Sequence, residues 1–167
     1  MYHAWISDPV VARYLTWRTS TRAESLIKLA EALQETHKQP RSKYFLAVVL
    51  RENDQIIGEA GFTIKSQGEG GGVAEMGYFL LQEYWGKGYA SEAAELMIGY
   101  CFSVLGLHKV TADCDAENRA SEGVMKKCGL IREAYRQKHY LLDGKWRDRL
   151  DYALLYEDWI MSQDLAE

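Results

Sequence analysis

A glycine turn between a predicted strand and a predicted helix is the feature that most restricts how this chain can fold. The turn runs Trp85-Gly86-Lys87-Gly88-Tyr89-Ala90. The residues before it, 73–81, are typical of a strand. The residues after it form an apolar stripe at helical spacing, namely Ala90, Ala93, Ala94, Met97, Ile98, Cys101, Phe102 and Leu105. A strand that leads directly into a helix with one apolar face predicts a sheet with that helix packed on it.

Two helices are predicted before this unit. Asp8 and Pro9 suit the start of a short helix that reaches Trp17. Thr21 and Glu24 have the spacing of a capping box, which predicts a second helix up to the polar stretch ending at Pro40. Beyond it the residue pattern changes to that of strands over 44–50 and 55–65, joined to strand 73–81 by a flexible connection rich in glycine.

The second half of the chain predicts one more helix between strands. Asn118 suits the start of a helix over 118–127, and Gly129 suits the left-handed position after its end. Further strands are predicted over 108–114, 130–142 and 146–155, followed by a short terminal helix. Asp143-Gly144 between the last two strands predicts a type I′ hairpin turn. The expected fold class is α+β, with helices on a mostly antiparallel sheet.

Length and charge restrict the class of protein. The 167 residues are enough for one core, so we expect a single domain over 1–167. The net charge is −4 and the basic residues are scattered, which argues against a nucleic-acid partner. The sequence has no apolar run long enough for a membrane span and no signal-peptide pattern, so we expect a cytoplasmic protein without a membrane partner. Its cysteines lack metal-ligand spacing, and no metal is expected.

The glycine turn favours binding of an anion. Unpaired backbone N–H groups and the positive end of the helix dipole point to one spot, and glycines let a ligand approach closely. A Walker loop would need Ser or Thr after Lys87, and a dinucleotide fingerprint would need glycine in place of Ser91. Both of these phosphate-binding motifs are therefore disfavoured. Two glycines at such a junction can also form a tight turn and nothing more.

Two distant motifs together resemble one enzyme family. The segments AEMGYFLLQEYWGKGYASEA and NRASEGVMKKCGL resemble the GNAT N-acetyltransferases, closest to their ribosomal-protein N-terminal (alanine/serine) acetyltransferase branch. The closing segment GKWRDRLDYALLYEDW resembles the same branch. The resemblance implies the GNAT fold and transfer of acetyl from acetyl-coenzyme A to a primary amine. That branch starts with a strand, and because only MYHAW precedes the first helix here, we expect the first strand to be absent or shortened.

The resemblance also implies a coenzyme A site. The backbone N–H groups of six consecutive residues would hold the pyrophosphate: Gly86, Lys87, Gly88, Tyr89, Ala90 and Ser91. The main chain of Phe79, Leu80 and Leu81 would pair with the pantetheine arm. Asn118 and Ser121 would lie near the pantetheine and the thioester.

Acetyl transfer to an amine needs a base for the ammonium and a proton for the thiolate. The resemblance places the carboxylate of Glu75 near the amine, and Glu59 is the other candidate base. Each can also be a solvated glutamate on an outer strand face. The tyrosine that many family members use as acid falls at Met125, so Ser121 is the expected replacement, although a serine there also bonds helix backbone.

Several functions remain open at this point. The leading hypothesis is direct attack of the amine, and a covalent route through Cys114 or Cys128 is the less favoured mechanism. Met125 motivates an alternative, a catalytically silent sensor that binds acyl-coenzyme A. A phosphate-binding module unrelated to acyl transfer is a third. The acceptor is a protein N-terminus or a small amine, and a homodimer is allowed.

Overall fold

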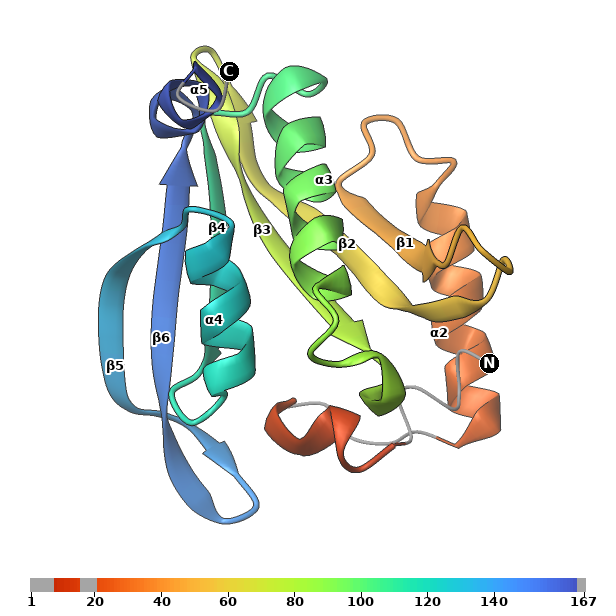
Figure 1. The fold of residues 1–167 in the computed structure, drawn as a ribbon. Helices are drawn as coiled ribbons and strands as arrows, with labels where there is room; N and C mark the ends of the chain where they lie inside the picture. The colour runs from red at the N-terminus through yellow and green to blue at the C-terminus, as the bar shows by residue number, and fades with distance from the viewer. Residues whose placement is uncertain (1–7, 16–20, 165–167) are drawn as a thin grey trace.

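The structure, a computed structural model, describes residues 8–15 and 21–164. A mixed sheet of six strands runs through the molecule in the order β1-β2-β3-β4-β6-β5 (Figure 1). The strands are β1 (Lys43–Val49), β2 (Ile56–Gly68), β3 (Gly71–Leu80), β4 (Lys109–Asp115), β5 (Ile131–Leu142) and β6 (Lys145–Leu155). Neighbouring strands are antiparallel except β3 and β4, which are parallel. The predicted α+β class is confirmed.

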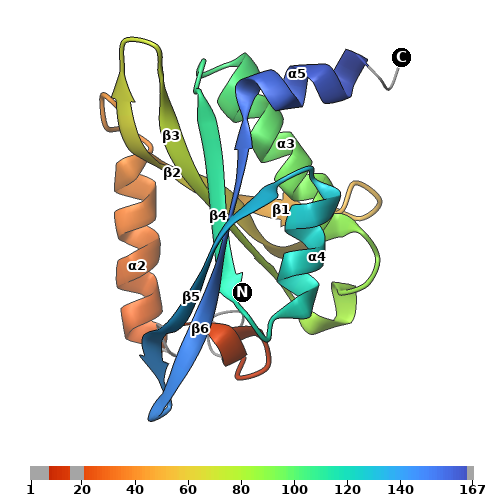
Figure 2. The same ribbon diagram turned by 90° about the vertical axis from the view of Figure 1, so that its left-hand side faces the viewer.

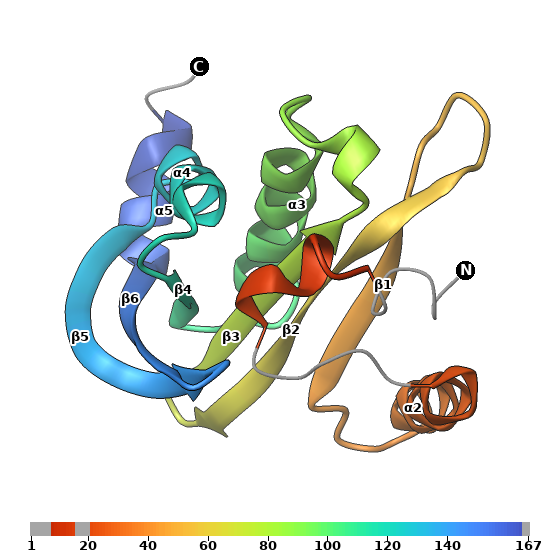
Figure 3. The same ribbon diagram turned by 90° about the horizontal axis from the view of Figure 1, so that it is seen from below.

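Helices cover both faces of the sheet. They are η1 (Val11–Tyr14), α2 (Arg22–Glu35), η2 (Gln82–Tyr84), α3 (Tyr89–Ser103), α4 (Arg119–Lys127) and α5 (Tyr156–Asp164). Helices α3 and α4 lie on one face and α2 on the opposite face (Figures 2 and 3). None of the helices in the described ranges is long and apolar enough to cross a membrane.

The hydrophobic core lies between the sheet and helices α3 and α4. Phe62, Val110 and Tyr152 of the sheet are almost fully buried there against Ile98 and Cys101 of α3. Burial of this apolar face is the main force that fixes α3, and with it the glycine turn, against the sheet.

The sheet opens where β3 and β4 separate. These strands pair only at Val73–Lys109, Ala74–Val110 and Glu75–Thr111. Beyond Glu75 no backbone ladder joins them, although β3 continues to Leu80 and β4 to Asp115. A gap therefore opens in the middle of the sheet, on the side where the glycine turn and the start of α4 lie (Figure 1).

Most predicted elements are confirmed, with three differences. The capping box of Thr21 and Glu24 is present, Asn118 caps α4, and Asp143 and Gly144 have the positive φ angles of a type I′ turn. The predicted first helix is only the short 3-10 helix η1, and its expected end at Trp17 lies outside the described residues. The segment MYHAW, which carries the expectation of a missing first strand, also lies outside them.

The other two differences concern the connection after β2 and the packing of α2. The glycine-rich connection is ordered as a tight hairpin, because β2 and β3 stay paired up to Gly68 and Gly71. Helix α2 forms as predicted, but its apolar residues Leu26 and Leu33 are exposed, whereas Glu35 is buried. The face that the helix turns toward the sheet is largely polar, and it lines the groove described below.

A buried ion pair ties the β5–β6 hairpin to the end of β4. The Arg147 guanidinium donates to both carboxylate oxygens of Asp115 at 2.8 and 2.9 Å, and Tyr140 also donates to Asp115. The Asp115 side chain is 1% exposed. Arg147 also contacts Glu117 at 2.8 Å, but Glu117 is 66% exposed. The buried contact, with its desolvated carboxylate, is the one expected to matter for stability.

We expect Asp115→Ala to lower the free energy of unfolding by about 3–5 kcal/mol, because it leaves Arg147 and Tyr140 without their buried acceptor. Glu117→Ala is the matched control and should cost less than about 1 kcal/mol, since exposed ion pairs contribute little. Urea unfolding of both variants measures the difference. Equal losses would contradict the role given to the buried pair.

Candidate active site

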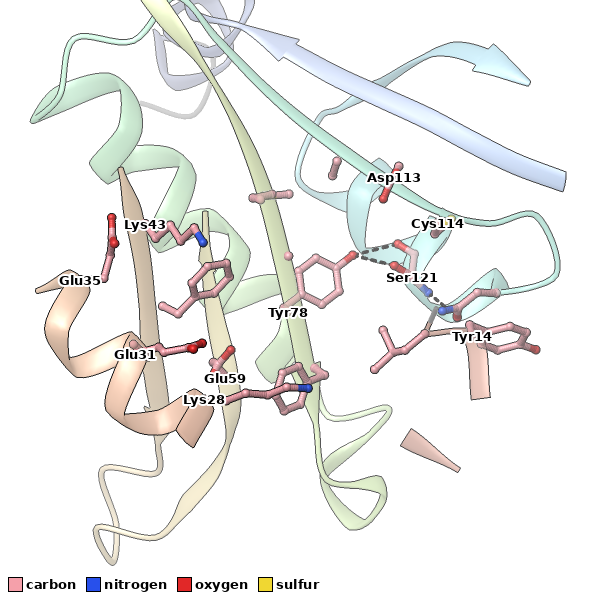
Figure 4. A pocket seen from close by; sticks show the side chains of 18 of the residues that line it. Tyr14, Lys28, Glu31, Glu35, Lys43, Glu59, Tyr78, Asp113, Cys114 and Ser121 are labelled. Atoms are coloured by element: carbon pink, nitrogen blue, oxygen red, sulfur yellow. Dashed lines mark hydrogen bonds between the residues drawn. The ribbon is translucent and has the colours of Figure 1, made fainter. Parts of the chain in front are cut away.

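A groove of about 780 Å³ runs from α2 across the sheet to the gap between β3 and β4 (Figure 4). One wall comes from α2 and the start of β1, including Lys28, Glu31 and Lys43. The floor includes Glu59, Gly77 and Phe79 of β2 and β3. The far wall comes from β4 and the start of α4, through Asp113, Cys114, Asn118 and Ser121. The groove therefore passes through the opening in the sheet.

The glycine turn forms an open cradle at the start of α3. Gly86 and Gly88 have φ angles of +72° and +89°, and a Cβ added to either would meet nothing within 4 Å. Gly88 precedes the first turn of α3 and supplies no side-chain cap. The N–H groups of that first turn have no partner inside the helix, so they can donate to an anion. The turn fits a pyrophosphate held by backbone groups.

The other residues of the predicted pyrophosphate site surround this cradle. Tyr89, Ala90 and Ser91 form the first turn of α3. The Lys87 ammonium lies over the Tyr84 ring, 5.3 Å from its centre. A cation in the turn adds to the attraction for phosphate. The assignment of residues 86–91 to the pyrophosphate stays a prediction that this geometry supports.

The predicted pantetheine residues lie at the end of β3, beside the gap. Two of their main-chain groups are already engaged: the Leu81 N–H donates to the Ile57 carbonyl at 2.9 Å, and the Leu80 carbonyl accepts from the Trp85 indole at 2.8 Å. Phe79 lines the groove. Pairing with pantetheine through residues 79–81 stays a prediction, and these two groups are not available for it without rearrangement.

Asn118 and Ser121 come together on the far wall. The Asn118 side chain accepts the backbone N–H of Ser121 at 3.2 Å, which caps α4 and fixes its start beside the groove. The Ser121 hydroxyl contacts the hydroxyl of Tyr78 at 3.1 Å, and Tyr78 also reaches the Ser121 carbonyl at 3.1 Å. These contacts span the gap between β3 and α4 (Figure 4).

Tyr78 is a candidate proton donor that the sequence analysis missed. It lines the groove, and burial raises the pKa of its phenol above the usual value, so it stays protonated at neutral pH. Met125, where a tyrosine acid was expected, is fully buried in the core. Strand alternation alone could not reveal Tyr78, because its use depends on the gap that brings it to Ser121.

Glu59 is a carboxyl group with a perturbed pKa on the groove floor. It lies in β2 opposite Phe79 of β3. Burial raises its pKa from 4.5 to about 7, and no nearby cation offsets this effect. A carboxylate with a pKa near 7 is suited to accept a proton at neutral pH. Glu59 thus places a carboxylate with a raised pKa on the floor of the groove.

Glu75 lies elsewhere. It is in the part of β3 that still pairs with β4, before the gap opens. Its carboxylate forms an ion pair with Lys65 at 2.9 Å, and its side chain is 45% exposed. It is not among the residues that line the groove. This placement favours Glu59 over Glu75 as the base.

The thiols of the chain are poor nucleophiles. Cys114 lines the groove, but burial raises its pKa to about 12. Burial likewise raises the pKa of Cys128 to about 11. Both thiols are therefore protonated at neutral pH, which disfavours a covalent acyl-cysteine route. Within the described ranges, no cluster of His, Cys, Asp and Glu could hold a metal ion.

Comparison with known sequences identifies a matching family model and related proteins. Residues 1–131 match the model of the acetyltransferase (GNAT) domain. The chain is 34% identical over 157 residues to the uncharacterized N-acetyltransferase YnaD of Bacillus subtilis, covering 94% of this chain and 87% of that protein. It is 31% identical over 127 residues to the ribosomal protein uS5-alanine N-acetyltransferase of Escherichia coli, covering 76% and 64%.

Comparison with solved structures also identifies acetyltransferases with a similar fold. A GNAT-family acetyltransferase from Bacillus anthracis is 30% identical, with a TM-score of 0.79 over 93% of this chain and 87% of that one. Spermidine N-acetyltransferase from Vibrio cholerae, in complex with CoA and spermine, has a TM-score of 0.81 over 95% and 89%. At 18% identity, the second likeness concerns the fold alone.

We expect Gly88→Ala to raise the dissociation constant for coenzyme A at least about tenfold, because the added methyl group stands in the cradle. Gly106→Ala is the matched control: its φ is +62° and its Cβ also meets nothing within 4 Å, but it lies at the other end of α3. Each variant should lose about 1–2 kcal/mol of stability from the left-handed backbone. Isothermal titration with coenzyme A measures the affinity of both variants. Equal affinities of Gly88→Ala and Gly106→Ala would contradict the assignment of the glycine turn to the pyrophosphate.

Proposed function

This chain belongs to the GNAT family of N-acetyltransferases, and from that premise we propose that it acetylates a primary amine by direct attack, with Glu59 as the general base. The observation that carries this proposal is the partly buried Glu59 carboxyl on the floor of a groove that leads to the gap in the sheet. Acetyl-coenzyme A would enter with its pyrophosphate on the glycine turn.

The base has to make the amine nucleophilic. An α-amine has a pKa of about 8 and a lysine side chain about 10, so either arrives largely protonated at neutral pH. Ionised Glu59 attracts the ammonium, and its own pKa near 7 lets it take the proton before the nitrogen attacks, so that the neutral amine is the nucleophile. The new bond joins nitrogen to the acetyl carbonyl carbon, and the carbon–sulfur bond then breaks.

The leaving thiolate needs a proton or a hydrogen bond. A thiolate of pKa about 8.5 is a modest base, so the acid contribution required is small. Tyr78 and Ser121 form a hydrogen-bonded hydroxyl pair beside the gap, and we assign this pair as the donor to the thiolate. The pair fills the role that Met125 leaves open. It also removes the main reason for regarding the chain as a silent acyl-coenzyme A sensor.

The first test replaces the proposed base. Glu59→Gln keeps the size of the side chain but cannot accept a proton, so kcat should fall by about 10²–10⁴-fold at pH 8. In the parent protein kcat should increase with pH around a midpoint near 7 and should fall at lower pH, because only ionised Glu59 can accept the proton. The variant should lack this inflection. Initial rates with acetyl-coenzyme A and saturating amine from pH 5.5 to 9 give the comparison.

Glu75→Gln is the matched control for this experiment and should leave kcat within about twofold, since Glu75 is exposed and outside the groove. A large loss in Glu75→Gln with little in Glu59→Gln would reverse the assignment. Binding of acetyl-coenzyme A without turnover of any amine would favour the sensor instead.

The folding of Glu59→Gln can be checked through stability. Folding raises the pKa of this carboxyl, so the native state binds more protons than the unfolded state between pH 4.5 and about 7. Ionised Glu59 therefore costs stability as pH rises through this window. The glutamine variant should be more stable than the parent at pH 8, on the order of 1–3 kcal/mol, and close to it below pH 4.5.

The hydroxyl pair predicts non-additive effects. Tyr78→Phe and Ser121→Ala should each lower kcat by about tenfold or more, and the double variant should lower it little further, because each hydroxyl acts through the other. A double-mutant cycle on kcat measures this coupling. If the fold-loss of kcat in the double variant equals the product of the two single fold-losses, the hydroxyls act separately.

A further inference from the structure

Gly77 lies in the interior of β3, on the floor of the groove, where neither its backbone nor its surroundings require a glycine. It pairs with Gly61 of β2 in a regular part of the ladder, and its φ angle is not in the left-handed region. A Cβ added to it would meet no atom of the described residues within 4 Å. A glycine inside a strand lowers stability relative to a residue with a side chain. The folded chain alone therefore gives no reason for this glycine.

Gly61, its partner, has a structural reason to be glycine. A Cβ on Gly61 would lie 1.9 Å from the carbonyl oxygen of Tyr44 and 2.7 Å from the Cα of Phe45 in β1. Gly61 thus permits the close approach of two strands. Above Gly77 the corresponding space is open to the groove instead. A strand glycine beside open space is typical of a position that a ligand approaches closely.

Gly77 belongs to a row of residues next to the row that contains Glu59. Cross-strand partners point to the same face of a sheet, so Phe45, Gly61 and Gly77 form one row on the groove face. Glu59 and Phe79 form part of the next row. Two residues along a strand span about 7 Å, which is the separation of the rows. The floor beside Glu59 is therefore bare of side chains at Gly61 and Gly77.

Aromatic side chains border this bare floor. Phe45 lines the groove from β1 with 40% of its surface exposed, and Phe79 lines it from β3. Only β2 separates these strands, so their backbones lie about 10 Å apart. The charged side chains Lys28 and Glu31 of the α2 wall are of opposite sign and select no net charge. A space of this width between aromatic side chains therefore favours an apolar group, which gains free energy by leaving water.

We propose that the preferred acceptor is a primary amine that carries an apolar group, such as an aromatic ring, about 7 Å from its nitrogen. The ammonium meets Glu59, and the apolar group covers Gly77 between Phe45 and Phe79. This inference rests on the proposed function and names its substrate class. Gly77 is thereby a specificity-determining residue, because its missing side chain leaves room for the apolar group. A free amine and the N-terminal residue of a peptide can both supply this chemistry.

The test compares amines of similar basicity that differ in the apolar group. The full chain is assayed with acetyl-coenzyme A and phenethylamine against ethanolamine, and with L-phenylalanine amide against L-serine amide. The first pair represents free amines and the second the N-terminal residue of a peptide. The aromatic member of at least one pair should have the higher kcat/KM, by about tenfold or more, because its ring is buried on the bare floor.

Gly77→Val fills the bare floor. It should lower kcat/KM for the aromatic amine at least about tenfold more than for its polar partner, because only the aromatic amine needs that space. Gly68→Val is the matched control: Gly68 lies in β2 outside the groove, its φ is not positive, and its Cβ would also meet no described atom within 4 Å. It should leave the preference unchanged within about twofold. Thermal melts check that both variants fold, since valine is favourable in strands.

Phe45→Ala removes one of the aromatic borders. It should raise the KM for phenethylamine at least about fivefold, with the KM for acetyl-coenzyme A unchanged within about twofold. Leu46→Ala is the control, because it removes a side chain that is 49% exposed on the opposite face of the same strand. Equal changes in the KM for phenethylamine would overturn the placement of the apolar group beside Phe45.

The outcomes separate this inference from the proposed function. A preference for the aromatic amine that Gly77→Val removes supports the inference, and the pair that shows it identifies the source. Equal rates within both pairs, or a preference for the polar amines, overturn it and leave the acetyltransferase proposal intact. If Gly77→Val instead lowers kcat/KM for hexanoyl-coenzyme A relative to acetyl-coenzyme A, with the amine preference unchanged, the space belongs to the acyl group and the inference is overturned.

If no amine is turned over, the proposed function fails, and binding decides the inference. Phenethylamine is then titrated calorimetrically into the coenzyme A-bound protein. Binding that Gly77→Val weakens still supports an apolar site on the groove floor. Binding that is absent, or that Gly77→Val leaves unchanged, overturns it.

Discussion

The separation of β3 from β4 is the constraint on which the rest of the structure depends. The two strands share only three residue pairs, ending at Glu75 and Thr111, and each then continues without the other. A central break would ordinarily leave backbone groups unpaired, at a cost in free energy. Here the break is spanned by Tyr78, which reaches Ser121 of α4 across it. The core between the sheet and α3 holds β3 in place, so the opening is a fixed feature of the fold.

The chemistry of the site follows from where this opening lies. It joins the glycine turn, which fits an anion, to a groove on the opposite side of the sheet in which Glu59 is partly desolvated. The same desolvation that makes Glu59 a useful base at neutral pH makes its ionised form unfavourable for stability. Such a conflict between stability and activity is common at functional sites. Glu75, paired with Lys65 in solvent, has no comparable conflict.

Much of the fold could be predicted from the sequence because its signals are local. The capping box at Thr21, the cap at Asn118 and the Asp143-Gly144 turn each depend on a few neighbouring residues. The glycine turn before α3 was predictable for the same reason, whereas its assignment to coenzyme A stays a prediction. Glu59 was one of the two candidate bases in the sequence, but its raised pKa was not predictable, because burial depends on tertiary structure. The contact of Tyr78 with Ser121 was not predictable for the same reason. The exposure of Leu26 and Leu33 in α2 could not be predicted either, because these residues have the same spacing as the apolar residues of a helix that buries one face.

The central claim is that Glu59 is the group that accepts the proton of the amine, and its ionisation can be measured directly. Carbon-13 NMR of glutamate side-chain carboxyls, titrated from pH 3 to 9, would follow it, with Glu59→Gln identifying its resonance. The account predicts a midpoint near 7 for Glu59. A midpoint near 4.5, the ordinary value for a glutamate, would mean that the carboxylate is fully solvated and would contradict its assignment as the base.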